Sequence, residues 1–176
     1  DCVKILVGKR FGKTSCHQDE INELIVTHAK KYGEVVRLKG GDSFIFGRGY
    51  EELMYAAQYG IAYEVIPGIS SSYSVPALAG IPLTSRGISE SFWVITGTTK
   101  SHKLSQDLLL AAQSTATVVI LMGLHKLAEI VQIYAHQNKL NESISIIQNG
   151  SRADQKIVTG KISNLEALAH VSEIGS

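Results

Sequence analysis

The sequence predicts an α/β fold with two α/β domains and a ligand cleft between them. Short apolar, β-branched runs alternate with helical patterns along the 176 residues, and helices placed between strands are typical of α/β sheets. A change in composition near Gly87 divides this alternation into two domains, residues 1–87 and residues 88–176. A cleft between two such domains is a preferred ligand site.

The first domain is expected to contain three strands and three helices. In the first helix, Ile21, Leu24, Ile25 and Ala29 share one face at helical spacing, and Gly33 is a suitable C-cap. The third helix is a small-residue segment that follows Pro67 and Gly68. The expected strands are residues 3–7, 35–36 and 62–66, and the expected helices are residues 19–32, 51–59 and 70–79.

The second domain repeats the alternation of strands and helices. Its strands are rich in Val, Ile and Thr, which favour a pleated, half-buried surface. The expected strands are residues 92–97, 117–123, 143–148 and 155–159, and the expected helices are residues 104–113, 124–137 and 163–170.

Composition argues against several classes of function. A net charge of +1 gives no reason to expect a nucleic acid as partner. The two cysteines cannot form a disulfide framework, and the six histidines lack metal-ligand spacing. No apolar run reaches the ~18 residues of a membrane span, and no signal peptide is visible. We therefore expect no membrane association and a cytoplasmic protein.

The two ends of the sequence indicate part of a longer chain. The chain begins at Asp1 without an initiating Met and runs directly into a strand-like segment. It stops just after an expected helix. We therefore expect an N-terminally truncated α/β protein.

Residues 35–52 form the most informative segment, because they read as a strand, a glycine loop and a helix. Gly40, Gly41 and Asp42 follow the strand, at the edge of an α/β sheet where ligands bind. Paired glycines let the backbone approach a ligand closely, and Asp42 adds an acceptor. The alternative for Gly40 to Asp42 alone is a tight turn, but the further glycines on both sides of Arg48 favour a binding loop.

Two other loops also follow apolar strands, so they can lie at the same sheet edge. Ser70 and Ser71 can cap the next helix or offer hydroxyl groups to a ligand. Met122, followed by Gly123, supplies a soft thioether for an adenine ring or a sulfonium methyl group; the alternative is a core residue at the end of a strand.

A fourth loop, residues 8–14, reads Gly-Lys-Arg-Phe-Gly-Lys-Thr. It suggests a phosphate- or nucleotide-binding module, but only three residues separate its glycines, whereas a P-loop needs four. Solvated basic side chains are the alternative.

The segment 35–52 resembles the signature of the uroporphyrinogen-III C-methyltransferases, within the tetrapyrrole methylase family. That family usually has Pro at the position of Ser43 and Gly at the position of Tyr50. The resemblance continues through residues 67–86, where the family's His stands at the position of Ser85. It covers nearly the whole chain in order. An N-terminal Gly-Pro-Gly-Asp loop, an Asp that ends the second strand and the last strand of the family are absent here.

The resemblance implies a cofactor, a substrate and their binding residues. S-Adenosylmethionine, with S-adenosylhomocysteine as its product, would bind in the interdomain cleft. Lys9 would be a catalytic proton donor. The candidate anchors for the substrate carboxylates are basic residues, chiefly Arg10, Arg48 and Arg86, with Lys13 and Arg152 as further candidates. The cofactor contacts carried over from the family are Gly40, Gly41, Asp42, Ile45, Ser70, Ser71, Met122 and Gly150.

The implied reaction is methyl transfer to uroporphyrinogen III, which gives precorrin-2 on the route to siroheme and cobalamin. The family also implies a homodimer. Two alternatives remain: a related methyltransferase that acts on a later corrin precursor or on RNA, and the phosphate-binding module of residues 8–14. The glycine loop favours uroporphyrinogen III.

Overall fold

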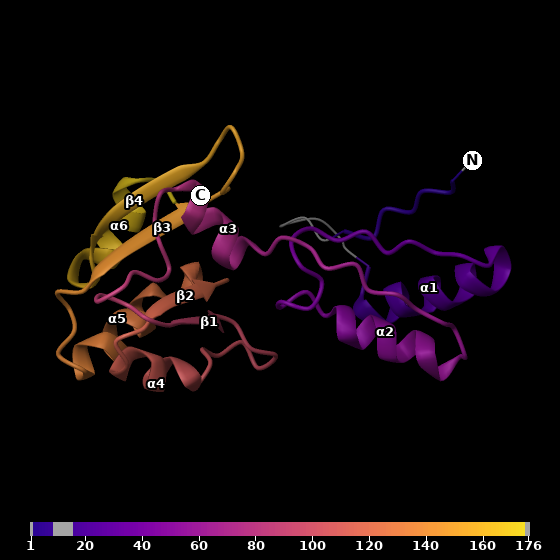
Figure 1. The fold of residues 1–176 in the computed structure, drawn as a ribbon, viewed down its shortest axis with the longest axis horizontal. Coiled ribbons are helices and arrows are strands. Elements are labelled where there is room, and N and C mark those ends of the chain that lie inside the picture. The colour runs from indigo at the N-terminus through magenta and orange to yellow at the C-terminus, as the bar shows by residue number, and fades with distance from the viewer. Residues whose placement is uncertain (1, 9–15, 175–176) are drawn as a thin grey trace. The chain divides into compact units, whose positions relative to one another are not determined.

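The structure is a computed structural model that describes residues 2–8 and 16–174. Contacts between residues group the chain into two compact units, Asp1–Ile69 and Ser70–Ser176 (Figure 1). The domain boundary expected at Gly87 lies inside the second unit, in a turn closed by a bridge between Ser85 and Ser89. As a boundary between domains of the whole protein it stays a prediction.

Among its described residues, the first unit contains two packed helices, α1 (Gln18–Tyr32) and α2 (Gly49–Gln58). The backbone N–H of His17 donates to Glu20 Oε2 (2.7 Å) and fixes the start of α1. At its end Gly33 takes a φ of 84° and donates to Ala29 O (2.8 Å), as expected for a glycine C-cap. The apolar side chains buried in this unit are Ile21, Val26, Ala29 and Ala56.

The three strands expected in the first unit are wrong for the described residues. Residues 3–7, 35–36 and 62–66 carry no strand hydrogen bonding in the part of the unit that the structure describes. Leu6, Val36 and Ile66 are 88%, 80% and 75% exposed, so no sheet face covers them. A β-branched run needs a neighbouring strand to satisfy its backbone groups, and local sequence does not supply that neighbour.

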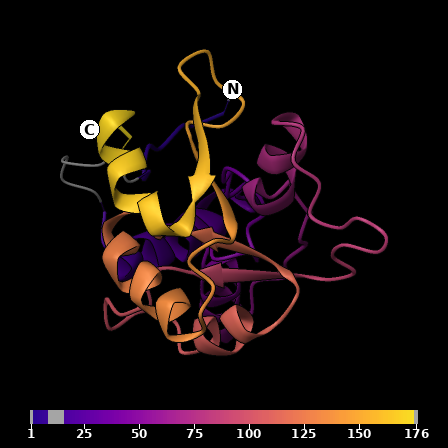
Figure 2. The ribbon, with the colours of Figure 1, turned by 90° about the vertical axis from the view of Figure 1, so that its left-hand side faces the viewer.

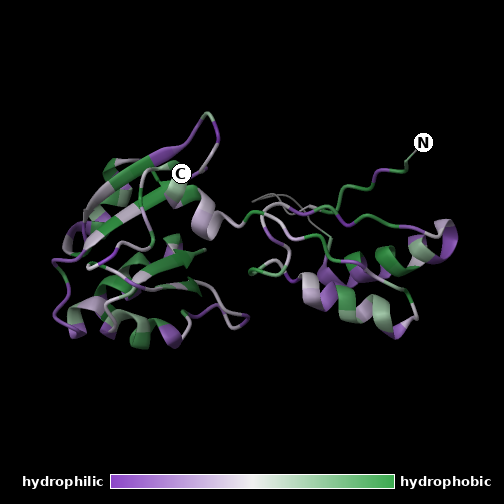
Figure 3. Ribbon diagram, in the orientation of Figure 1, coloured by the Kyte–Doolittle hydropathy of each residue, from purple (hydrophilic) through white to green (hydrophobic). Residues whose placement is uncertain are grey.

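The second unit contains two small sheets. β1 (Phe92–Thr96) pairs in parallel with β2 (Thr117–Leu121), with Val94 opposite Val119. β3 (Ser143–Gln148) pairs antiparallel with β4 (Lys156–Lys161), with Ile146 opposite Val158. Figure 3 shows that apolar residues are concentrated on β1, β2 and β3. The four strands expected in this unit are confirmed to within two residues at each end.

The helices of the second unit also agree with the sequence, with shifted ends. The expected helix 104–113 begins later, and the expected helices 124–137 and 163–170 each begin as a 3₁₀ turn. Helix α4 contacts β1 and α5, whereas helix α6 contacts β4 and α5. Figure 2 shows these helices together on one side of the unit. The elements are α3 (Ser71–Leu78), α4 (Asp107–Gln113), η1 (Leu124–Lys126), α5 (Leu127–His136), η2 (Ile162–Asn164) and α6 (Leu165–Val171).

The core of the second unit lies between these helices and the strands. It contains Ile95 of β1, Leu108 and Ala111 of α4, Ile130 of α5 and Leu165 of α6, all buried. Trp93, Val118 and Ile120 pack against this cluster. Burial of these side chains is the main favourable contribution to the stability of the unit.

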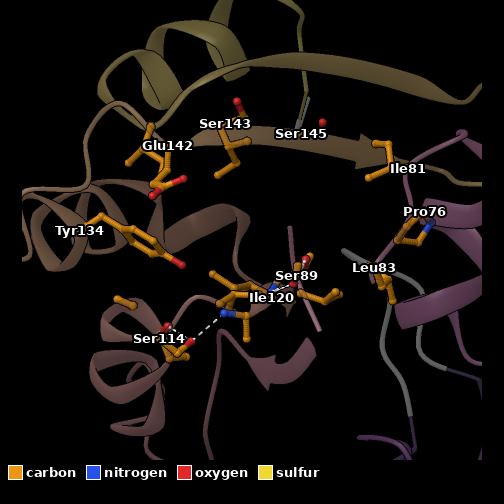
Figure 4. Close-up of a pocket in the computed structure, with 18 of the residues that line it drawn as sticks. Pro76, Ile81, Leu83, Ser89, Ser114, Ile120, Tyr134, Glu142, Ser143 and Ser145 are labelled. Carbon is orange, nitrogen blue, oxygen red and sulfur yellow. Dashed lines mark hydrogen bonds between the residues drawn. The ribbon is translucent and has the colours of Figure 1, made fainter. Parts of the chain in front are cut away.

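A cavity of about 820 Å³ lies beside β2 and β3 in the second unit (Figure 4). Among the described residues each sheet has two strands, so β2 and β3 each keep one edge without a strand partner. All five residues of β2 line the cavity, and so do Ser143, Ile144, Ser145 and Ile147 of β3. No helix among the described residues is long and apolar enough to cross a bilayer.

Leu108 and Leu109 provide a matched test of this core. Leu108 is fully buried, whereas Leu109 is 47% exposed. We expect Leu108→Ala to lower the free energy of unfolding by about 2–5 kcal/mol, because it removes buried methyl groups and leaves a cavity. Leu109→Ala should change it by no more than ~0.5 kcal/mol. Thermal unfolding of both variants measures the difference, and equal losses would contradict the assignment of the core.

Candidate functional site

The predicted glycine loop of the first unit connects residue 39 to helix α2. Gly41 has a φ of 70°, a left-handed conformation that favours glycine. Gly40 differs, because a Cβ built at Gly40 would meet no described atom within 4 Å. The backbone at Gly40 therefore has open space beside it, as a loop that receives a ligand requires.

The side chain of Asp42 holds the glycine loop against the loop that contains Gly68. Asp42 Oδ1 accepts from the backbone N–H of Phe44 (2.8 Å), and Oδ2 accepts from the N–H of Gly68 (3.0 Å). A Cβ at Gly68 would lie 2.0 Å from Gly41 O, so only glycine fits there. Each carboxylate oxygen keeps further lone pairs that a ligand could use. The structure thus gives Asp42 a role in shaping the loop besides the predicted role in cofactor binding.

The glycines on both sides of Arg48 have a local steric cause. A Cβ at Gly47 would lie 2.6 Å from Ser43 O, and a Cβ at Gly49 would lie 2.7 Å from the same oxygen. The N–H of Gly49 donates to this oxygen (2.9 Å). Phe46 and Arg48 have positive φ values of 53° and 59°, which is strained for non-glycine residues and is often found at functional sites.

Two predicted side chains of this loop are partly exposed. Ile45 is 38% exposed, and its N–H donates to Asp42 O (3.3 Å). The guanidinium group of Arg48 forms an ion pair with Glu51 on the first turn of α2, with Arg48 Nε 2.9 Å from Glu51 Oε1. Arg48 would have to leave Glu51, or share it, to bind a substrate carboxylate.

Glu52 is a charged residue of this region that the sequence analysis did not single out. It is 5% exposed and accepts hydrogen bonds from Gln18, Arg37 and Lys39. The sequence pattern could have indicated Glu52, because it lies four residues before buried Ala56 and therefore on the buried face of α2. A carboxylate on such a face requires cationic or hydrogen-bonding partners.

In the second unit, Ser70 caps helix α3. Its Oγ accepts from the N–H of Ser72 (3.2 Å) and lies 2.9 Å from Ser72 Oγ, and both side chains are buried. Of the two roles expected for these serines, helix capping therefore applies to Ser70. The neighbouring Ser71 is exposed, so its hydroxyl group is better placed than that of Ser70 to reach a ligand.

Met122 lies directly after β2, at the carboxyl end of the parallel pair. It has a φ of 58° and is 55% exposed, so it is not a core residue. Thr98 Oγ1 donates to Met122 O (3.0 Å), and a Cβ at Gly97 would lie 2.3 Å from Gly123 Cα. The loops after β1 and β2 therefore lie side by side, and the Met122 side chain is available to a ligand.

Gly150 follows β3 and packs against helix α3. A Cβ at Gly150 would lie 2.5 Å from a methyl group of Val75. Two predicted cofactor contacts therefore lie close to the same helix: Ser71 is the first residue of α3, and Gly150 packs against Val75 of α3. Within the second unit, the predicted cofactor contacts all lie at the start of α3 or just after a strand.

Two of the predicted site residues, Lys9 and Arg10, lie outside the described residues, as does most of the loop 8–14. Arg86 is exposed in the turn between Ser85 and Ser89. The described residues contain no group of three or more His, Cys, Asp or Glu side chains that could hold a metal ion.

The large cavity of the second unit is separate from most of these residues. Of the predicted site residues only Ser71 lines it. Tyr134 and Glu142 also line it (Figure 4), and burial, together with the charge of Glu142, raises the pKa of Tyr134. Because the cavity follows the open edges of β2 and β3, it gives no reason to move the candidate site away from the strand-end loops.

Comparison with protein families gives one match over most of the chain. The profile of the family described as Tetrapyrrole (Corrin/Porphyrin) Methylases matches residues 4–166. A siroheme synthase from Yersinia enterocolitica is 44% identical over 171 residues, which are 97% of this chain and 36% of that protein. A uroporphyrinogen-III C-methyltransferase from Methanocaldococcus jannaschii is 41% identical, over 94% of this chain and 69% of that protein.

Solved structures show the same fold. The uroporphyrin-III C-methyltransferase from Thermus thermophilus, complexed with S-adenosylhomocysteine, has a TM-score of 0.74 and 29% identity over 85% of this chain and 66% of that chain. A cobalt precorrin-4 methyltransferase has a TM-score of 0.81 at 18% identity, over 92% of this chain and 68% of that chain. The predicted α/β class is thereby confirmed. The chain spans about a third of the siroheme synthase and about two thirds of the methyltransferases.

Asp42→Asn tests the loop contact. Asn offers one carbonyl acceptor in place of two carboxylate oxygens, so we expect faster amide hydrogen exchange at Phe44 or Gly68 and a lower melting temperature. Hydrogen bonds from the backbone of Phe44 and then Gly68 lower the pKa of Asp42, against the opposing effect of burial. The stabilisation is therefore complete above the ordinary pKa of about 3.9 and is lost as the pH falls through the lower folded-state pKa.

Melting curves of Asp42→Asn and the unchanged protein from neutral to acidic pH measure this dependence. Their difference should shrink at acidic pH, and a constant difference would contradict the assigned contact. Asp19→Asn, which changes an exposed carboxyl group of α1, should leave exchange at Phe44 and Gly68 unchanged.

Proposed function

The chain belongs to the tetrapyrrole methylase family, and we propose that the full-length protein is an S-adenosylmethionine-dependent C-methyltransferase that converts uroporphyrinogen III to precorrin-2. The observation that carries the proposal is the 41% identity, over nearly the whole chain, to a protein named for this activity. The Thermus thermophilus relative with S-adenosylhomocysteine supports the choice of cofactor. Siroheme synthases among the relatives support a place in siroheme formation.

The described residues fit the proposed cofactor. Gly40 leaves open space beside the loop backbone, and Asp42 has lone pairs that remain for hydroxyl groups. Met122 presents an exposed thioether at a strand end, where it can contact an adenine ring or a methyl sulfonium group. These observations support Gly40, Asp42 and Met122 as cofactor contacts. The full proposed set follows the family resemblance and is Gly40, Gly41, Asp42, Ile45, Ser70, Ser71, Met122 and Gly150.

The protein's task in this reaction is mainly to orient the reactants. The cofactor supplies a methyl group that is already activated on its sulfonium sulfur. An electron-rich pyrrole carbon attacks this methyl group, a C–C bond forms, and the electron pair of the broken C–S bond goes to sulfur. Orientation of two bound reactants can contribute up to about 7–11 kcal/mol. The methylated carbon system then loses a proton, which requires a base within hydrogen-bond reach.

Basic side chains are suited to the eight carboxylates of the substrate. We propose Arg10, Arg48 and Arg86 as anchors, because a guanidinium group binds a carboxylate through two parallel hydrogen bonds. Of these, Arg48 lies at the end of the glycine loop itself, where α2 begins. We also propose that the protein acts in the cytoplasm as a homodimer, in keeping with the family resemblance.

Two measurements on the full-length protein test the function. Calorimetry should detect binding of S-adenosylhomocysteine, and mass spectrometry should detect methylated product after incubation with S-adenosylmethionine and uroporphyrinogen III. Binding without methylation of uroporphyrinogen III, together with methylation of a later corrin precursor, would move the proposal to that substrate. Absence of cofactor binding would overturn it.

Gly40→Ala separates a binding loop from a turn. The new methyl group meets no described atom within 4 Å, and the φ of Gly40 lies outside the left-handed region, so the melting temperature should stay unchanged. If the cofactor lies against this backbone, the methyl group occupies its space and the dissociation constant should rise by roughly tenfold or more, or about 1.4 kcal/mol. Unchanged affinity in a folded variant would remove Gly40 from the site.

Lys9→Met tests the proposed proton donor. Loss of a general acid or base slows the chemical step by roughly a hundredfold or more. Substitution of a residue that does not touch the cofactor leaves the affinity for the cofactor unchanged. We therefore expect slower methylation at saturating cofactor and near-normal binding of S-adenosylhomocysteine. Lys30→Met, which changes an exposed lysine in the last turn of α1, is the control and should retain turnover. Normal turnover of Lys9→Met would return Lys9 to the role of a solvated residue.

A further inference from the structure

We propose that Glu52 is a positioning residue that holds the glycine loop in the conformation that binds the cofactor. This inference rests on the function proposed above, because it concerns the same loop. It assigns to a buried carboxylate outside the cofactor contacts the task of fixing both ends of the loop.

Glu52 connects three parts of the first unit. Its Oε1 accepts from Gln18 Nε2 (3.0 Å), at the start of α1. The same oxygen lies 2.9 Å from Lys39 Nζ and 3.3 Å from Arg37 Nη2, and Oε2 lies 3.0 Å from Lys39 Nζ. Glu52 itself lies on the first turn of α2. Through this one buried carboxylate, α2 is therefore connected to α1 and to the segment that leads into the glycine loop.

The position of these contacts in the chain gives them their importance. Lys39 immediately precedes Gly40, and Glu52 lies just beyond the end of the loop at residue 48. The ion pair thus closes the loop at its base, and the hydrogen bond from Gly49 to Ser43 O closes a smaller ring inside it. A loop whose ends are held together has fewer conformations to lose when it binds a ligand.

The charges make the loop dependent on Glu52 in particular. The Arg37 and Lys39 side chains are 27% and 14% exposed, and their shared carboxylate partner is 5% exposed. Arg37 Nε is buried and has no hydrogen-bond partner among the described residues. Without the carboxylate charge, two partly buried cations would lose their partner, and such groups move toward water when they can. The segment that they occupy leads directly into Gly40 and Gly41.

The neighbouring carboxylate provides a matched control. Glu51 lies on the same turn of α2, but its side chain is 54% exposed and it forms an ion pair with Arg48. Glu51→Gln removes the same charge at the next position without touching Arg37 or Lys39. A general effect of charge on cofactor affinity would appear equally in both variants.

The first experiment compares Glu52→Gln with Glu51→Gln in the full-length protein. If the binding conformation of the loop falls to a tenth of its population, the dissociation constant of S-adenosylhomocysteine rises roughly tenfold. We expect this rise for Glu52→Gln, a change within about twofold for Glu51→Gln, and turnover at saturating cofactor near normal. A general loss of folded protein would instead lower turnover and leave affinity unchanged. Equal affinities of the two variants would overturn the proposal.

The second experiment needs no cofactor. Amide hydrogen exchange at Gly40, Gly41 and Asp42 should be faster in Glu52→Gln than in Glu51→Gln, because the loop opens more often. If the unchanged protein does not bind S-adenosylhomocysteine, the proposed function is wrong. The exchange measurement still decides, independently of the cofactor, whether Glu52 orders the loop. Unchanged exchange in the loop would overturn the proposal whatever the cofactor result.

A second variant covers the case in which Glu52→Gln does not fold. Lys39→Met keeps the carboxylate with its Gln18 and Arg37 partners and removes only the contact next to Gly40. We expect the same changes in affinity and loop exchange as for Glu52→Gln, but smaller. A folded Lys39→Met protein with normal affinity and normal exchange would contradict the positioning role of Glu52.

Discussion

The contact between the loops that contain Gly41 and Gly68 is the constraint on which the proposed site of the first unit depends. Two glycine backbones approach so closely that a single Cβ at Gly68 would collide with Gly41 O. Asp42 secures the contact by accepting hydrogen bonds from the N–H groups of Phe44 and Gly68. Backbone shape and a side-chain carboxylate therefore determine together which N–H and C=O groups a ligand would meet.

The glycines of the loop serve different physical purposes, although the sequence presents them alike. Gly41 allows a left-handed backbone, and Gly47 and Gly49 allow Ser43 O to lie close to the chain. Gly40 has neither cause within the described structure. Under the proposed function, Gly40 is the position at which the cofactor lies against the backbone.

Local pattern predicted the second unit well, because its strands and helices carry their own propensity and periodicity. It failed for residues 35–36 and 62–66, where a strand depends on a partner distant in sequence. The glycine loop and the strand-end position of Met122 were predictable, since both follow apolar runs. The contacts of Asp42 with Gly68 and of Glu52 with Lys39 were not, because hydrogen bonds across 26 and 13 positions follow from folding in space.

The unpaired edges of β2 and β3 bear on how this polypeptide behaves at high concentration. An open strand edge presents backbone groups that can pair with another chain. β2 reads Thr-Val-Val-Ile-Leu, with no charge, proline or glycine to discourage such pairing, and this composition is typical of segments that form intermolecular β-structure. Solubility of these 176 residues therefore depends on keeping one short apolar strand covered, and a lysine placed on its edge is a direct means of protecting it.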